Sequence, residues 1–341
     1  MLLREGLDTE VLTYRDGSFY SGSLTAAGVR HNYIPQRGGE LRLISDIAAH
    51  LRENACEVLI SFLAGTNIKA CLVKRLCPGL RLIVSERNCN LRLQFHDRLR
   101  FGLYRRYADS IVCNSYAQSE FIRTYSPRLA GRIYTIPNFV DLERFRPATD
   151  KEKSHDGPFR VVTTARLSAR KNALGLIKAA ALCPGISFSW YGADKQDRYY
   201  QQCMHLISKL GLQARFHFYP SESNSEQLYS RFDAFCLPSF YEGTPNSLAE
   251  ALACGLPVVC SRVSDNHRYI SEGQNGYLVN PSDPSAIADA LLRIASFSPE
   301  ALAAAGLKSR RIAETAFRQE SFVRRYMELL SGPKGGTKHN S

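Results

Sequence analysis

Short apolar segments alternate with helical ones along almost the whole chain, and this alternation constrains the fold more than any other feature. In the first half, strands are predicted near residues 10–14, 28–33, 57–62, 80–84, 110–113 and 131–136, with helices near 38–54, 67–76, 91–107 and 115–125. In the second half, strands are predicted near residues 159–165, 186–191, 214–219, 233–237, 257–261 and 276–279. Strands that alternate with helices form parallel sheets covered by helices, so an α/β fold is expected.

The length of 341 residues exceeds the usual size of a single hydrophobic core, which predicts two domains. A polar segment that ends in Gly and Pro, residues 150–158, is interpreted as the linker between domains at 1–149 and 159–316. Residues 317–330 predict a final amphipathic helix, and residues 331–341 are too polar and Gly-rich to fold.

The formal net charge of +12 indicates anionic partners, such as a phosphorylated substrate or an acidic membrane surface. Nucleic acid is not expected, because the chain carries no recognisable nucleic-acid-binding motif. Residues 91–107 interleave apolar side chains with Arg92, Arg98, Arg100, Arg105 and Arg106. Such a segment either lies on anionic lipid or is an ordinary helix with its apolar side in the core.

No segment approaches the roughly 20 apolar residues of a membrane span, and no signal region opens the chain. We therefore expect a cytoplasmic protein. The ten cysteines include no Cys-x-x-Cys pair, which favours free thiols, and the eight histidines show no ligand spacing. Without an Asp-x-Asp pair either, neither a metal site nor a cofactor is predicted.

The segment Glu242–Glu250 places two carboxylates across a Gly/Pro loop and the start of a predicted helix, directly after the strand at 233–237. A strand, loop and helix in this order bind phosphate at the carboxyl edge of a parallel sheet. One alternative is that Ser247 and Glu250 form only a capping box. A second strand, at 159–165, is followed by Arg166 and Lys171, so both cations are expected to reach the same diphosphate.

With these residues the chain resembles the retaining glycosyltransferases of family 4. The resemblance rests on four ordered motifs: Glu242 with Glu250, Arg166-Leu167 with Lys171, the segment 136–147, and the segment 59–63 through 84–88. It implies the GT-B fold, in which two Rossmann-like domains face a cleft and the last helix crosses back to the first domain. It also implies metal-independent transfer of a hexose or N-acetylhexosamine from a UDP- or GDP-sugar to a lipid-linked or polysaccharide acceptor of the cell envelope. For residues 91–107 the resemblance favours contact with lipid, which implies a peripheral position at the inner face of the cytoplasmic membrane.

The same resemblance implies a role for each matching residue. Glu242 accepts hydrogen bonds from the donor sugar and Glu250 from the ribose, while Arg166 and Lys171 hold the departing diphosphate. Arg166, Lys171 and Glu242 are thus the expected catalytic residues. The remaining substrate-binding candidates are Gly243, Thr244, Pro245, Asn246, Ser247, Asn138 and Phe218, with Phe218 equally explained by core packing.

Two further candidates follow the strand at 80–84 in the first domain. Glu86 and Arg87 are expected either to orient the acceptor or to pair with each other as an exposed salt bridge.

One departure from the family concerns the start of the chain. Residues 1–8 resemble the region before the second strand of the family, so the first domain is expected to lack the first strand and its Gly-rich loop. Gly38-Gly39-Glu40 more closely resembles the start of a helix. Loss of a central strand raises an alternative function: a nucleotide-sugar-binding protein with impaired catalysis.

Overall fold

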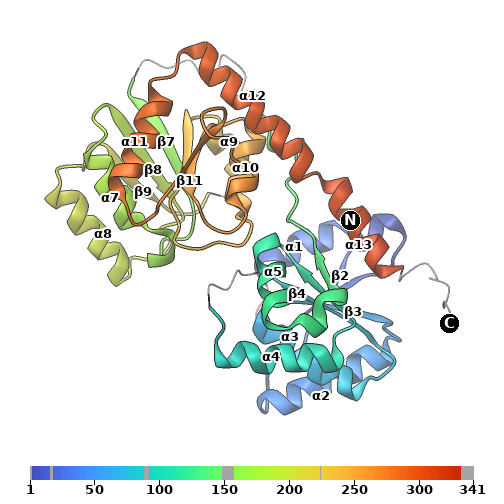
Figure 1. Ribbon diagram of the computed structural model, residues 1–341. Helices are drawn as coiled ribbons and strands as arrows, with labels where there is room; N and C mark the ends of the chain where they lie inside the picture. Colours follow the sequence, from blue (N-terminus) through green and yellow to red (C-terminus); the bar gives the residue numbers. More distant parts are fainter. Residues whose placement is uncertain (1, 16–17, 88–91, 148–156, 223, 332–341) are drawn as a thin grey trace. The chain divides into compact units, whose positions relative to one another are not determined.

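The computed structural model describes residues 2–15, 18–87, 92–147, 157–222 and 224–331. The chain divides into two compact units (Figure 1). Unit 1 comprises Met1–Ile136 together with Glu320–Ser341, and unit 2 comprises Pro137–Gln319. The disordered tail expected at 331–341 and most of the linker expected at 150–158 lie outside the described residues.

The larger sheet of unit 1 has four parallel strands in the order β3-β4-β5-β6. Their bounds are β3 Val58–Phe62, β4 Arg81–Glu86, β5 Ser110–Cys113 and β6 Ile133–Thr135. They are connected through α3 (Ala64–Leu76), α4 (Phe95–Tyr107), α5 (Tyr116–Tyr125) and the short helix η2 (Pro127–Arg132). Leu82 and Val84 of β4 pack with Phe101 and Tyr104 of α4 in one core cluster. Alternate residues of the central strands therefore face these helices.

Unit 1 also contains a separate sheet of two parallel strands, β1 (Glu10–Thr13) and β2 (Arg30–Tyr33). It is accompanied by η1 (Leu2–Glu5), α1 (Ser18–Ala26) and α2 (Gly39–Glu53). Among the described residues, no strand joins β1 to β3, so the parallel arrangement is interrupted between these two strands. Gly38 and Gly39 begin α2, as the sequence predicted.

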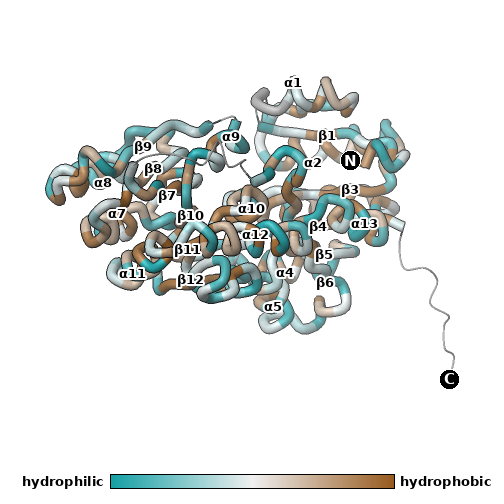
Figure 2. Tube along the Cα trace, turned by 90° about the horizontal axis from the view of Figure 1, so that it is seen from above, coloured by the Kyte–Doolittle hydropathy of each residue, from teal (hydrophilic) through white to brown (hydrophobic). Residues whose placement is uncertain are grey.

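Strand β3 has the burial of an edge strand, although its residues are almost all apolar (Figure 2). Val58, Leu59 and Ile60 are only half-buried, whereas four successive residues of β4 are fully buried. A strand paired on both sides buries its apolar residues more completely. The half-exposed β3 residues are therefore a direct consequence of the interruption.

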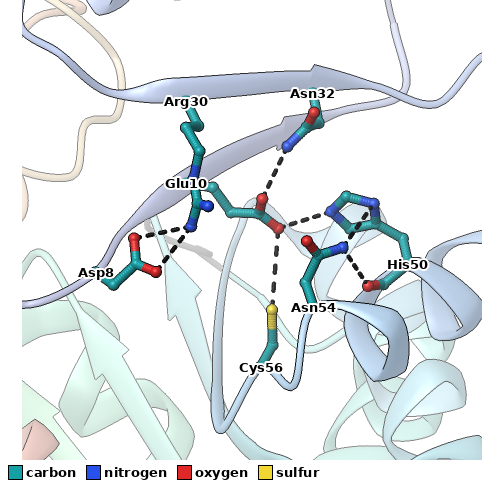
Figure 3. A network of polar contacts seen from close by, with 7 residues as sticks. All are labelled: Asp8, Glu10, Arg30, Asn32, His50, Asn54 and Cys56. Atoms are coloured by element: carbon teal, nitrogen blue, oxygen red, sulfur yellow. Dashed lines mark hydrogen bonds and ion pairs between the residues drawn. The ribbon is translucent and has the colours of Figure 1, made fainter.

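Helix α2 spans the interruption by packing against both sheets. Leu12 of β1 and Leu59 of β3 both contact the apolar cluster of α2 around Leu43 and Ile47. A polar network adds to this packing at the start of the strands (Figure 3). There Glu10 of β1 accepts a hydrogen bond from Asn32 of β2 (2.8 Å) and pairs with His50 of α2 (2.7 Å).

Helix α13 (Gln319–Leu330) covers the opposite face of the four-stranded sheet. Its Tyr326 and Leu329 pack against Ile83 of β4 and Val112 of β5. The Arg81 guanidinium donates a hydrogen bond to the carbonyl oxygen of Leu330 at 2.8 Å. The final helix thus completes the core of unit 1.

The boundary between the units differs from the one expected at 149–150. Residues 137–147 belong to unit 2, because Val140 and Phe145 are buried in its core. The backbone N–H of Val140 also donates to the carbonyl oxygen of Phe317 at 2.9 Å. The boundary between the units therefore lies between Ile136 and Pro137 rather than at residues 149–150.

Unit 2 contains six parallel strands in the order β12-β11-β10-β7-β8-β9. Their bounds are β7 Phe159–Thr164, β8 Ile186–Tyr191, β9 Phe216–Tyr219, β10 Ala234–Leu237, β11 Val258–Ser261 and β12 Gly276–Val279. The connecting helices are η3 Ala169–Lys171, α7 Ala173–Ala181, α8 Arg198–Lys209, α9 Ser225–Tyr229, α10 Asn246–Ala253, η4 Asn266–Arg268, α11 Pro284–Ala295 and α12 Pro299–Ala316. Helices α7, α8 and α11 cover one face of the sheet, and α9, α10 and α12 cover the other. This is a doubly wound parallel sheet.

The nine cysteines within the described residues have free thiols, and all but Cys56 are buried. Those residues contain no cluster of His, Cys, Asp and Glu able to hold a metal ion. No single described helix has the length and apolar composition needed to cross a membrane.

Candidate functional site

The candidate site of unit 2 lies where β7 and β10 end side by side. The two strands are paired in parallel, so the loops that follow them leave the same edge of the sheet. The loop after β7 also packs tightly against Gly192, which follows β8. Gly192 has φ +115°, and an added Cβ there would lie 2.3 Å from the carbonyl oxygen of Ala165. Only glycine fits this approach, which fixes the backbone leading into Arg166.

Lys171 and Glu242, two of the three expected catalytic residues, are in direct contact. The Lys171 ammonium lies 2.5 Å from a Glu242 carboxylate oxygen, and the two residues are only 9% and 6% exposed. Burial lowers the pKa of Lys171, and the neighbouring Glu242 carboxylate opposes that shift. The contact is supported by the backbone, since the N–H of Phe240 donates to the carbonyl oxygen of Arg170 at 2.9 Å.

Arg166, the third expected catalytic residue, is exposed at the same edge. The positive charges of Arg166 and Arg170 both act to lower the pKa of Lys171. Three cations therefore gather after β7, while Glu242 neutralises one of them. The remaining positive charge suits a diphosphate.

Helix α10 begins at Asn246 directly after the Glu242 loop, and no side chain caps its N-terminus. The positive helix end is therefore available to an anion. Asn138 holds this loop in place: its side-chain amide donates to the Asn246 side chain at 2.6 Å and to the carbonyl oxygen of Thr244 at 3.3 Å. The structure thus brings Asn138 to the loop formed by Gly243, Thr244, Pro245, Asn246 and Ser247.

Glu250 makes no capping box, so that alternative interpretation is wrong. The N-cap position is Pro245 rather than Ser247, and the Glu250 carboxylate instead accepts a hydrogen bond from the Tyr229 hydroxyl at 2.8 Å. Burial raises the pKa of Glu250, and the bond from Tyr229 opposes this rise. A half-buried carboxylate beside a helix N-terminus is well placed to accept hydrogen bonds from hydroxyl groups of a ligand.

Two residues that position the site were not predicted from the sequence. Tyr229 orients Glu250 and is itself 2.6 Å from the hydroxyl of Thr164 on β7. Asn172 caps α7 with φ +62° and donates to the carbonyl oxygens of Pro238 (3.1 Å) and Pro281 (2.7 Å). An Asn before a helical run is a recognisable capping signal, whereas the contact between Tyr229 and Glu250 depends on tertiary packing alone.

Phe218 lies on β9 among aromatic side chains, which accounts for its presence by packing. Its ring centroid is 5.7 Å from Tyr200, 5.4 Å from Phe216 and 6.2 Å from Trp190. In unit 2, then, the structure gathers the predicted residues at the ends of β7 and β10, and Phe218 lies apart in the β8–β9 core.

In unit 1, Glu86 does not form the exposed salt bridge with Arg87 that one interpretation expected. Glu86 is only 2% exposed, accepts a hydrogen bond from the Tyr104 hydroxyl and lies 3.3 Å from the Arg100 guanidinium. Arg100 also pairs with Asp97 at 2.8 Å. Arg100 is therefore buried in an ion-pair network, and its interpretation as a lipid-facing cation is wrong.

Comparison with solved structures identifies the fold. The crystal structure of Anabaena HepE in complex with UDP and glucose has a TM-score of 0.85 with this chain at 20% sequence identity. The match covers 94% of this chain and 91% of that one. Two parallel-sheet units with this architecture have the GT-B fold.

The sequence patterns of two known protein families together match most of the chain. "Glycosyltransferase Family 4" matches residues 1–144 and "Glycosyl transferases group 1" matches residues 145–309. The chain belongs to glycosyltransferase family 4, and it is a transferase.

Two relatives share similar levels of identity with the chain. The lipopolysaccharide core biosynthesis glycosyltransferase LpsE of Rhizobium meliloti is 29% identical over 194 residues, which cover 56% of this chain and 55% of that protein. The UDP-Gal:alpha-D-GlcNAc-diphosphoundecaprenol alpha-1,3-galactosyltransferase of Escherichia coli is 29% identical over 180 residues, covering 48% and 45%. The matched segments thus span about half the length of each relative.

Proposed function

We propose that this protein is a retaining glycosyltransferase that moves a hexose or N-acetylhexosamine from a UDP- or GDP-sugar to a lipid-linked or polysaccharide acceptor of the cell envelope. The observation that carries the donor side of this proposal is the buried contact between Lys171 and Glu242 beside the uncapped N-terminus of α10. It places a cation, a carboxylate and free backbone N–H groups at one edge of one sheet.

Each group has a part in donor binding. Arg166, Lys171 and the first N–H groups of α10 bind the diphosphate, while Glu242 accepts hydrogen bonds from hydroxyls of the sugar. Glu250, oriented by Tyr229, accepts hydrogen bonds from the ribose. A carboxylate can accept from two adjacent hydroxyls at once, which suits both of these roles.

The proposed reaction uses these groups as follows. The bond between the anomeric carbon and the diphosphate oxygen breaks, and the acceptor hydroxyl oxygen bonds to the same face of that carbon. The acceptor proton passes to the departing phosphate oxygen. Arg166 and Lys171 stabilise the charge that develops on the leaving group, so the scheme needs no metal ion.

The proposed acceptor class and location draw on the relatives and on the surface of α4. One relative is named for lipopolysaccharide core biosynthesis and another for a diphosphoundecaprenol acceptor. On α4, Phe95 is 78% exposed and Leu99 58% exposed, with exposed Arg98, Arg105 and Arg106 on the same helix. Exposed apolar and basic side chains together suit peripheral binding to an anionic membrane, on the cytoplasmic side.

The test is turnover with a panel of UDP- and GDP-sugars, measured for the wild type, Arg166→Ala and the control Arg311→Ala. Arg311 is an exposed arginine of α12 that has no role in the scheme. We expect Arg166→Ala to lose about 100-fold in rate with unchanged circular dichroism, and the control and a chelator-treated sample to keep full rate. Equal rates for Arg166→Ala and the wild type would remove Arg166 from the mechanism, and loss of activity with the chelator would overturn metal independence.

A second candidate function is a nucleotide-sugar-binding protein with impaired catalysis, which the interrupted sheet of unit 1 favours. Unit 2 has an unbroken sheet and carries all of the proposed donor contacts. Calorimetric binding of UDP-sugar without turnover on any acceptor would favour this candidate, whereas product formation would exclude it.

A further inference from the structure

Arg87 is a half-buried cation that the donor site does not use. It follows β4 directly, at the carboxyl edge of the four-stranded sheet. Its guanidinium lies 5.5 Å from the ring centre of Phe62, at the end of the neighbouring strand β3. One of its terminal nitrogens, Nη1, is buried and has no hydrogen-bond partner among the described residues.

The nearest acidic residue in the sequence is not available to Arg87. Glu86 instead contacts Arg100 and Tyr104 of α4. Among the described residues, no carboxylate lies within ion-pair distance of the Arg87 guanidinium. Burial lowers the pKa of Arg87, and Tyr326 of α13 opposes this shift.

A buried guanidinium without a counter-ion reduces the stability of a fold. Such a group is best explained where a ligand supplies the missing charge. The planar fork of Arg matches the oxygens of a phosphate group and can donate two parallel hydrogen bonds. Phe62, 45% exposed beside it, adds an apolar surface next to the anion.

We propose that Arg87 binds a phosphate or diphosphate group of the acceptor, which makes this a transferase for phosphate-bearing acceptors. This inference rests on the proposed function, because the donor diphosphate is there assigned to Arg166, Lys171 and α10 of unit 2. An anion bound by unit 1 then belongs to the other substrate. The Tyr326 hydroxyl lies near Arg87 and Ser85, which both act to lower its pKa, and it can donate to the same anion.

The test is calorimetry on the full chain saturated with UDP, so that the donor site is filled. Inorganic pyrophosphate and geranyl diphosphate are titrated separately into the wild type, Arg87→Gln, Arg87→Lys and the control Arg75→Gln. Arg75 is an exposed arginine of α3 with no role in either proposed site. We expect Arg87→Gln to bind both probes at least about tenfold more weakly, Arg87→Lys to lose less, and the control to match the wild type.

The two probes separate the possible sources of the phosphate. If Arg87→Gln weakens the binding of both probes equally, the protein recognises the anion alone. If the wild type binds geranyl diphosphate more tightly than pyrophosphate, the acceptor is lipid-linked. Both outcomes support the proposal. Wild-type affinity in Arg87→Gln, or no pyrophosphate binding by the UDP-saturated wild type, would overturn it.

Thermal unfolding separates a binding role from a structural one. Because Arg87 has no ion-pair partner in the part of the chain that the structure describes, Arg87→Gln should be at least as stable as the wild type. A clear loss of stability would mark Arg87 as structural. Failure of the proposed function is distinguishable from failure of this inference. Absence of UDP binding or of turnover contradicts the proposed function, whereas the effect of Arg87→Gln on diphosphate binding requires no turnover.

Discussion

At the scale of single residues, the site depends on charges that compensate one another inside the protein. Lys171 and Glu242 are both buried, and each provides the counter-ion that offsets the cost of burying the charge of the other. Removal of one partner from such a pair destabilises a protein strongly, but replacement of both by neutral groups is often close to neutral. Stability and catalysis can therefore be separated at this pair.

The first prediction follows from this coupling. Lys171→Met alone should reduce stability by about 3 kcal/mol and abolish turnover, because Glu242 is left as an unpaired buried carboxylate. Lys171→Met combined with Glu242→Gln should recover most of the stability but none of the activity. Urea unfolding and turnover on the same preparations measure both quantities. Additive losses of stability in the double variant would show that the pair is not coupled.

The second prediction concerns pH. Burial raises the pKa of Glu250 above its usual value of 4.5, so the folded protein binds this proton more tightly than the unfolded chain. The stabilising effect is then fully present below about pH 4.5 and is lost as pH rises through the folded pKa. Glu250→Gln removes this dependence. Its stability relative to the wild type should thus increase from pH 4.5 to 8, as measured by urea unfolding, while its affinity for UDP falls.

A constant stability difference across that pH range would show that Glu250 has the same pKa in the folded and unfolded states. Unchanged UDP affinity would remove Glu250 from the donor site.

At the scale of elements, the strands were largely predictable because apolar runs bounded by turn residues specify them locally. Helix α1 (Ser18–Ala26) was not predicted, since its Ser, Thr and Gly residues favour helix only weakly. The carboxyl-edge positions of Arg166, Lys171 and Glu242 followed from the order of strand and loop. The partners of Glu86 and Glu250 did not, because Arg100 and Tyr229 reach them from helices through packing that no local pattern encodes.

The third prediction belongs to α4, whose exposed side chains carry the proposed membrane contact. Replacing Arg98, Arg105 and Arg106 with Gln should weaken binding to anionic vesicles, at about 1 kcal/mol per cation, and high salt should have the same effect on the wild type. Binding to neutral vesicles should not change. Arg100 is left intact because its guanidinium is buried. Vesicle co-sedimentation at low and high salt measures the effect, and salt-independent binding would contradict it.

At the scale of the whole molecule, two α/β units could be predicted from length and from the strand–helix alternation, but their boundary could not. Polar composition pointed to residues 150–158, whereas the burial of Val140 and Phe145 assigns residues 137–147 to unit 2. The interruption between β1 and β3 was expected from the order of elements. Its consequence for β3, a set of half-exposed apolar residues, required the structure.

The fourth prediction concerns the packing of α13, in the C-terminal segment of unit 1, against the sheet formed by the N-terminal segment. Leu329→Ala should destabilise that unit by about 2–5 kcal/mol, because Leu329 is buried against the four-stranded sheet. Hydrogen exchange of β4 and β5 should increase, while UDP affinity, which we propose to depend on unit 2, should not change. The exposed Arg324 of the same helix gives the matched control, Arg324→Ala. Slow exchange retained in β4 and β5 would show that α13 contributes little to the core of unit 1.

The contribution of α13 to unit 1 also has a consequence for synthesis on the ribosome. The strands of unit 1 end at Thr135, but the helix that covers one face of their sheet begins at Gln319. At translation rates of about 5–20 residues per second, that apolar face stays uncovered for roughly 10 to 40 s after β6 has been made. Unit 2 is complete before unit 1 can finish folding. The nascent chain therefore presents Ile83 and Val112 to chaperones, or to neighbouring chains, throughout the synthesis of unit 2.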